Sequence, residues 1–199
     1  IVGILGPNGC GKTTTIGMIL GLLKPSNGKV LINGIEIEKK RVDLLNQLNF
    51  ISPYIELPKK LTVNQNLEVY GRLYDVKNLK KKIEMLTDKL RLSEIINKLT
   101  GELSSGQKNR VSLAKSIINN PAVLLLDEPT ASLDPETGAF VRSCLESYQK
   151  ENKASILLAS HNMSEVESLC SSVLMMNKGS IVDSGKPEQF IKKNEREHM

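Results

Sequence analysis

The eight residues Gly6-Pro7-Asn8-Gly9-Cys10-Gly11-Lys12-Thr13 constrain the fold of this 199-residue chain more than any other stretch. They fit the pattern G-x-x-x-x-G-K-[ST] and lie between an apolar run, residues 1–5, and a helix-like segment, residues 14–23. In a strand–loop–helix unit of this kind, glycines let the backbone wrap closely around phosphate groups. Lys12 supplies positive charge to the β- and γ-phosphates, and the Thr13 hydroxyl is a potential Mg²⁺ ligand. The pattern predicts a nucleotide-binding loop.

The composition is that of an ordinary soluble globular protein, with 40% hydrophobic and 25% charged residues. A chain of this length suits one domain, or one domain with an inserted lobe. The longest apolar runs, such as residues 123–126 and 155–159, are far shorter than the roughly 18 residues of a membrane span. The net charge of +5 allows an acidic partner surface, although a mildly basic soluble protein is the simpler interpretation.

The chain start and the cysteines bear on the cellular setting. No signal peptide is recognised, and without an initiator Met we expect a natural N-terminal segment to precede Ile1. The cysteines Cys10, Cys144 and Cys170 are odd in number and lack C-x-x-C spacing, which favours a reducing, cytosolic setting. Because Cys10 lies beside Lys12 and the following helix N-terminus, we expect its thiol to be biased toward thiolate and protected by bound nucleotide.

Strand and helix patterns alternate at both ends of the chain. Besides residues 1–5, strands are expected at 29–37 as a hairpin around Asn33-Gly34, at 48–51, at 122–126, at 155–159, and on both sides of 177–179. Helices are expected over 14–23, from Pro135 onward, and near 164–170. This alternation is typical of an α/β fold with a mostly parallel core sheet and small antiparallel elements.

The middle of the chain has helical spacing and almost no strand pattern. Thr62 and Gln65 resemble a capping box, and a further helix is expected over 107–119. We therefore expect a single domain over residues 1–199, with an α/β core at 1–60 and 121–199 and an inserted helical subdomain at about 61–120.

Two carboxylates follow the apolar strand at 122–126. In parallel α/β sheets ligands gather at the carboxyl ends of strands. There Asp127 can hold Mg²⁺ through water, and Glu128 can polarise the water that attacks a γ-phosphate. His161 follows the next strand in the same position and is well placed to meet that phosphate. The structural alternative is that the acidic residues only cap a strand and that the histidine only packs.

The stretch GELSSGQKNR, residues 101–110, is a second candidate anion site. Two serines and a glycine precede a helix expected to begin near Gln107. Unpaired N–H groups at a helix start, with hydroxyls beside them, suit a phosphate.

Together these motifs resemble the ATP-binding cassette family, specifically the nucleotide-binding subunit of an ABC transporter. The family's signature loop is matched by Leu103-Ser104-Ser105-Gly106-Gln107, its acidic pair by Asp127-Glu128, its D-loop by residues 131–134 ending in Asp134, and its switch histidine by His161. The resemblance covers essentially the whole chain. It implies a P-loop NTPase fold that binds ATP and Mg²⁺ and hydrolyses ATP. The nucleotide-binding residues are expected to be Gly6, Pro7, Asn8, Gly9, Cys10, Gly11, Lys12, Thr13 and Thr14.

The resemblance also implies a use for the second anion site. In the family two cassettes pack head to tail, and each signature loop closes on the ATP held by the partner. Ser104, Ser105, Gly106 and Gln107 would thus act in trans, in a dimer with a second copy or a paralogous cassette.

Residues 61–75 and 164–190 look like those of exporters whose separate membrane subunits are of the ABC-2 type, a group that moves drugs, lipids, polysaccharides or haem. The partner would be an integral membrane permease in a separate chain, with no nucleic acid involved. The location would be the cytoplasmic face of the inner or plasma membrane.

The sequence departs from the family pattern in three places. Ser105 replaces the first of two glycines, and its Cβ restricts the backbone in a way that can hinder phosphate approach or turnover. Alignment puts Pro53 where the family has a glutamine that touches Mg²⁺ and the membrane partner, with Ser52 as a weak substitute. The family's adenine-stacking aromatic residue would fall before Ile1.

Three alternatives remain open. Chromosome-maintenance and DNA-repair ATPases share the signature loop but insert long coiled coils, whereas only 104 − 12 = 92 positions separate Lys12 from Ser104. Ribosome-associated translation factors need two cassettes in one chain. A degenerate, non-hydrolysing cassette is the third alternative, motivated by Ser105 and Pro53.

Overall fold

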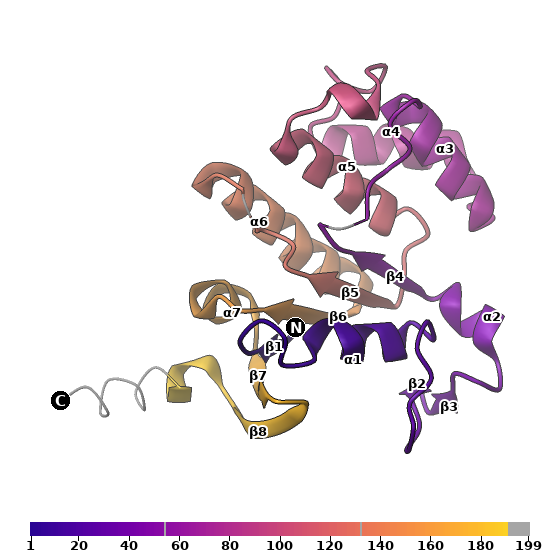
Figure 1. The fold of residues 1–199 in the computed structure, drawn as a ribbon. Helices are drawn as coiled ribbons and strands as arrows, with labels where there is room; N and C mark the ends of the chain where they lie inside the picture. The colour runs from indigo at the N-terminus through magenta and orange to yellow at the C-terminus, as the bar shows by residue number, and fades with distance from the viewer. Residues whose placement is uncertain (54, 132, 191–199) are drawn as a thin grey trace.

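The structure, a computed structural model, describes residues 1–53, 55–131 and 133–190 (Figure 1). Its centre is a six-stranded sheet with the order β4-β5-β6-β1-β7-β8. The strands are β1 (Val2–Leu5), β4 (Leu48–Ile51), β5 (Val123–Asp127), β6 (Ser155–Ser160), β7 (Ser172–Asn177) and β8 (Ser180–Gly185). In this sheet order, each strand from β4 through β5, β6 and β1 to β7 is parallel to its neighbour, and β8 is antiparallel to β7. The loops that follow β1, β5 and β6 therefore leave the sheet at one edge.

A separate two-stranded hairpin consists of β2 (Leu31–Ile32) and β3 (Ile35–Glu36). Its turn residues Asn33 and Gly34 both have positive φ, 51° and 76°, as a two-residue hairpin turn of the right twist requires. The predicted hairpin is thus confirmed, with shorter strands than expected.

Helices cover both faces of the sheet (Figure 1). On one face α1 (Lys12–Ile19) and α2 (Arg41–Leu45) pack in a small core in which Ile16 and Leu44 meet Leu125. On the other face lie α5 (Ser105–Ser116), α6 (Pro135–Asn152) and α7 (Met163–Leu169), over the larger core that contains Leu124 and Leu126. Successive residues of β5 thus point to opposite cores, as expected for a strand buried on both faces.

Between β4 and β5 the chain forms α3 (Val63–Leu73), α4 (Leu79–Lys89) and a 3₁₀ turn, η1 (Thr100–Glu102), before α5. The predicted capping box is present: the Thr62 side chain accepts from the Gln65 N–H, and the Gln65 side chain accepts from the Thr62 N–H. Leu67 and Leu86 share one hydrophobic cluster with Leu124, so the helical insertion packs continuously onto the sheet.

Three helices differ from expectation. Helix α1 begins at Lys12 and ends at Ile19, because the N–H groups of Gly21 and Leu22 bond back to Met18 O and Gly17 O and close the last turn. Helix α5 begins two residues before Gln107, because the Ser104 side chain caps it. Helix α2 was not expected, since its five residues are too few to give a periodic pattern. The α/β fold with a mostly parallel sheet, small antiparallel elements and inserted helices is confirmed.

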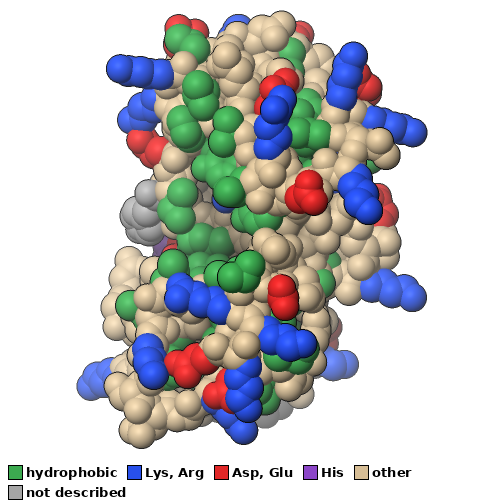
Figure 2. Space-filling model, turned by 90° about the vertical axis from the view of Figure 1, so that its right-hand side faces the viewer, with side chains coloured by type: hydrophobic (Ala, Val, Ile, Leu, Met, Phe, Trp, Pro, Cys, Tyr) green, Lys and Arg blue, Asp and Glu red, His purple; other side chains and the backbone are tan. Residues whose placement is uncertain are grey.

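Figure 2 shows hydrophobic side chains gathered on one face of the molecule, mainly in its upper half. Helices α3, α4 and α5 lie at that height in Figure 1. Exposed hydrophobic residues of the segment from β4 to α3 include Ile55, Val69 and Leu73. Among the described residues, no helix has both the length and the apolar character needed to cross a bilayer.

Candidate functional site

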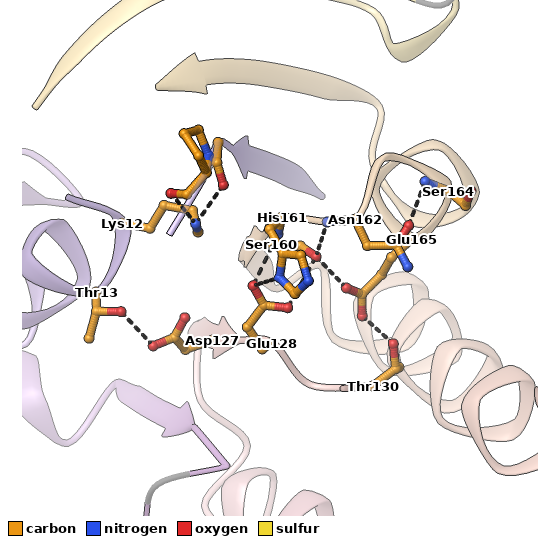
Figure 3. Close-up of polar contacts among 12 residues, drawn as sticks. Lys12, Thr13, Asp127, Glu128, Thr130, Ser160, His161, Asn162, Ser164 and Glu165 are labelled. Carbon is orange, nitrogen blue, oxygen red and sulfur yellow. Dashed lines mark hydrogen bonds and ion pairs between the residues drawn. The ribbon is translucent and has the colours of Figure 1, made fainter. Parts of the chain in front are cut away.

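The predicted phosphate loop connects the end of β1 to α1 and curls around the Lys12 ammonium group. Lys12 Nζ donates to Gly6 O at 2.7 Å and to Pro7 O at 3.1 Å (Figure 3), and only 6% of the residue is exposed. Gly11 caps α1 with φ of 110°, a backbone conformation that disfavours a side chain. The loop thus holds a positive charge at its centre, beside the N-terminus of a helix, which together favour an anion.

Thr13 and Asp127 face each other across the mouth of this loop. Thr13 Oγ1 donates to Asp127 Oδ2 at 3.0 Å, although 114 residues separate them in sequence. Burial raises the pKa of the Asp127 carboxyl, and the hydrogen bond from Thr13 partly opposes that rise. A hydroxyl and a carboxylate that meet in this way offer the oxygen ligands that Mg²⁺ prefers.

Glu128 and His161 meet at the adjacent strand ends. Glu128 Oε1 lies 2.6 Å from His161 Nδ1 and also accepts the backbone N–H of His161 at 3.0 Å. The φ of Glu128 is 51°, an unfavourable value for a glutamate, and this turn directs its side chain toward β6. The structure therefore brings together the two residues that the sequence proposed as catalytic.

An open pocket of about 380 Å³ joins the loop to the two carboxylates. Its lining residues are Asn8, Gly9, Gly11, Lys12, Thr13, Thr14, Asp127 and Glu128. The size falls within the range of small-molecule sites, about 300–1,000 Å³. Most of the residues predicted to bind nucleotide thus line one pocket.

Cys10 is an exception, because its side chain points away from the pocket. It is 3% exposed and packs with Ile4 and Met176 in a small hydrophobic cluster, while its carbonyl accepts the Gly179 N–H at 2.8 Å. The expectation of an accessible thiol that bound nucleotide would protect is therefore wrong. The side chain anchors the loop to β7 instead of facing the phosphates.

The predicted signature loop forms the start of α5. The Ser104 side chain accepts the Gln107 N–H at 3.3 Å, and the Gln107 side chain accepts the Ser104 N–H at 3.0 Å. Ser105 is the first residue of α5, and its φ is not positive. Its Cβ therefore causes no backbone strain. A Cβ at Gly106 would lie 3.3 Å from Thr137 Cγ2, a tight contact that would require the Thr137 side chain to shift by a few tenths of an ångström.

The four signature residues, Ser104 to Gln107, do not line the pocket of the phosphate loop within the described chain. Asp134, the predicted D-loop residue, caps α6: its carboxylate accepts the Thr137 N–H at 2.9 Å. Ser132 of that loop lies outside the described residues.

A groove borders the site on the side of the helical insertion. Pro53 and Ser52, at the predicted glutamine position, line it together with Ser105 and Glu128. Glu128 thus lies between this groove and the phosphate pocket.

Sequence reasoning missed a polar cluster behind Glu128. Glu165 accepts hydrogen bonds from the hydroxyls of Thr130 and Ser160 (Figure 3). Thr130 and Ser160 could have been found, because Thr130 comes shortly after β5 and Ser160 is the last residue of β6, at the same sheet edge. Glu165 could not, because nothing in the pattern distinguishes it from the exposed Glu167 on the same helix.

Comparisons with known proteins agree with this geometry. Residues 1–131 match the family model described as ABC transporter. The chain is 33% identical over 202 residues to ABC transporter ATP-binding protein NatA of Bacillus subtilis (strain 168), covering 100% of this chain and 82% of that protein. It is 37% identical over 192 residues to Nod factor export ATP-binding protein I of Rhizobium johnstonii, covering 95% of this chain and 61% of that protein.

Two solved structures have the same fold. The cbiO1 protein of Clostridium perfringens, described as part of the ABC transporter complex cbiONQ, superposes with a TM-score of 0.84 at 30% identity, covering 98% of this chain and 80% of that one. The dimeric post-hydrolysis cassette MJ0796 bound to ADP and Pi has a TM-score of 0.84 at 24% identity, covering 94% and 85%.

The fold and the site define a phosphate-loop nucleotide-binding protein. More particularly, the chain belongs to the ABC transporter family, as an ATP-binding cassette of its ATPase subunits.

Proposed function

We propose that the pocket binds Mg²⁺–ATP and that Glu128 is the general base of its hydrolysis. The observation that carries this proposal is the meeting of the Thr13–Asp127 pair and the Glu128–His161 pair at one edge of the sheet. Lys12 would neutralise the β- and γ-phosphates, and Thr13 with Asp127 would hold the metal ion, Asp127 through water.

In the reaction, water gives a proton to Glu128 as its oxygen bonds to the γ-phosphorus. The bond from that phosphorus to the β–γ bridging oxygen breaks, which releases ADP and phosphate. His161 holds one oxygen of Glu128 through its ring and its backbone N–H. Proton transfer from water to a general base such as Glu128 typically contributes about 10²–10⁴-fold to the rate.

We further propose that two cassettes close head to tail around two ATP molecules. Ser104 to Gln107 lie outside their own chain's phosphate pocket, which supports a role on the partner's nucleotide. The N–H groups of Ser105 and Gly106, in the first turn of α5, have no partner within the helix by geometry and suit an anion. The dimeric state of the MJ0796 cassette is consistent with this arrangement. Asp134 is proposed to lie in the D-loop at the interface between the two cassettes.

We also propose that the protein serves an exporter through a membrane partner; the chain spans 61% of the length of the Nod factor export relative. The name of that relative supports a role in export, and the description of cbiO1 as part of a transporter complex supports a partner in a separate chain. An exporter of the ABC-2 group with an integral membrane permease is the form we propose. The apolar groove that contains Pro53, Ile55 and Leu57 is the surface proposed to meet the permease. The protein would then lie on the cytoplasmic face of the membrane. Within it, residues 61–120 are proposed to form one helical subdomain.

The test is ATP turnover by the full-length protein with Mg²⁺, with EDTA, and in the Glu128→Gln variant. We expect hydrolysis only with Mg²⁺, and a loss of roughly 100-fold or more in Glu128→Gln with ATP binding retained. Turnover by Glu128→Gln at the wild-type rate would contradict the assignment of the base.

A further inference from the structure

Behind the proposed base lies a second carboxylate, which is buried. Glu165, the third residue of α7, is 5% exposed. No ion pair among the described residues includes it. Its charge is instead stabilised by two hydroxyl donors and by the first turn of α7. A buried carboxylate held only by neutral groups is costly, so its position needs an explanation.

The two hydroxyls come from the two chain segments that hold Glu128. Thr130 follows Glu128 by two residues, and Ser160 immediately precedes His161. Glu165 thus links the segment that carries Glu128 to the segment that binds its carboxylate. Figure 3 shows Glu165 on the far side of Ser160 from Glu128.

Ser160 has a single hydroxyl proton and two carboxylates within reach. Its Oγ lies 2.7 Å from Glu165 Oε2 and 3.4 Å from Glu128 Oε2, and it accepts the Asn162 N–H at 3.0 Å. Because one hydroxyl donates one proton, the shorter contact assigns that proton to Glu165. Glu128 Oε2 then faces an oxygen that offers it no proton.

We propose that Glu165 is a positioning residue of the ATPase site, which holds the Ser160 proton away from Glu128. Glu128 Oε2 is thereby kept free to accept a proton from the attacking water. A hydrogen bond to that oxygen would stabilise the charged carboxylate and make it a weaker base. This inference rests on the proposed role of Glu128.

The test is the Glu165→Gln variant of the full-length protein, with kcat and KM for ATP measured separately. Gln has nearly the same shape but no charge, so Glu128 becomes the stronger acceptor for the Ser160 proton. We expect kcat to fall roughly 10- to 100-fold, the usual effect of losing an outer-shell partner. KM for ATP should stay within about threefold, because Glu165 does not line the phosphate pocket. Glu167→Gln, with the same charge change at an exposed position of the same helix, should keep the wild-type kcat.

The double variant Glu165→Gln with Ser160→Ala separates positioning from a merely structural role. Ser160 is the only donor to Glu128 Oε2 among the residues that the structure describes, so without its hydroxyl kcat should recover toward the wild-type value. If Glu165 only supports the fold, the second change should lower kcat further. A wild-type kcat in Glu165→Gln, or a double variant slower than the single one, would overturn the proposal.

Melting temperatures show whether each variant is folded. If Glu165→Gln is not, Glu165→Asp replaces it, since Asp also only accepts hydrogen bonds; it should keep kcat within about fivefold. A loss in Glu165→Asp as large as in Glu128→Gln would again overturn the proposal. Wild-type turnover by Glu128→Gln would instead refute the proposed function itself.

Discussion

His161 holds one oxygen of Glu128 by two contacts at once, from its ring and from its backbone. Nδ1 lies 2.6 Å from Oε1, and the same oxygen accepts the His161 N–H at 3.0 Å. The carboxylate is therefore fixed in orientation by the end of β6, and Oε2 is the oxygen left for water.

Replacing His161 by Ala removes the ring contact and leaves the backbone one. We expect kcat for ATP to fall roughly 100-fold, within the range for an acid–base group, because the carboxylate loses its fixed orientation. The affinity for ATP, measured by calorimetry, should change little, since His161 does not line the phosphate pocket. A kcat equal to that of the wild type would show that the ring does not contribute.

Replacing Lys12 by Ala should abolish ATP binding and leave the fold intact. The ammonium lies at the centre of the loop and, within the described part of the chain, bonds to the carbonyls of Gly6 and Pro7, so its loss removes the charge that meets phosphate. Calorimetry with ATP gives the affinity, and the melting temperature without nucleotide gives the stability. Lys24→Ala, at an exposed lysine on the surface, is the control and should bind ATP normally. Equal ATP affinity in Lys12→Ala and wild type would contradict the site.

The three thiols should react slowly with maleimide in the native protein. Cys10, Cys144 and Cys170 are all buried, and burial raises the pKa of Cys170 to about 12 and also raises the pKa of Cys144. Thiolate is the reactive form, so both access and ionisation are unfavourable there. Labelling followed by mass spectrometry should become fast only in denaturant. Rapid native labelling of Cys10 that ATP prevents would contradict the buried position of its side chain.

Replacing Asp134 by Ala should lower the melting temperature, because α6 loses its N-cap, whereas Asp134→Asn keeps a capping side chain. Hydrogen bonds from the side chain and the backbone of Thr137 lower the pKa of Asp134. The ionised carboxylate therefore stabilises the folded state at pH values above the pKa of Asp134 in the unfolded chain, about 4. That contribution is lost as the pH falls through the lower pKa of the folded state.

The difference in melting temperature between wild type and Asp134→Ala should thus be largest near pH 7 and shrink below about pH 4. Asp88→Ala, at an exposed aspartate in the last turn of α4 that caps no helix N-terminus, is the control and should show no such pattern. A difference that grows on acidification would have the wrong sign.

The sequence was sufficient to predict the strands and the pocket because both follow from local rules. A run such as residues 122–126 reads as a buried strand, and parallel strands place the residues after them, Asp127 and His161, at one edge. The direction of the Cys10 side chain was not predictable, because it depends on contacts with β7 that are made 166 positions later at Met176. The Glu165 cluster was missed for the same reason, since burial of a carboxylate is a tertiary property.

Sedimentation of the full-length Glu128→Gln protein tests the central claim, two cassettes sharing two ATP sites, most directly. With hydrolysis stalled, ATP should convert the monomer into a dimer, and ADP should not. Adding Ser104→Arg should abolish the dimer without weakening ATP binding, because Ser104 lies outside the chain's own phosphate pocket. A Glu128→Gln protein that binds ATP yet remains monomeric at high concentration would contradict the account.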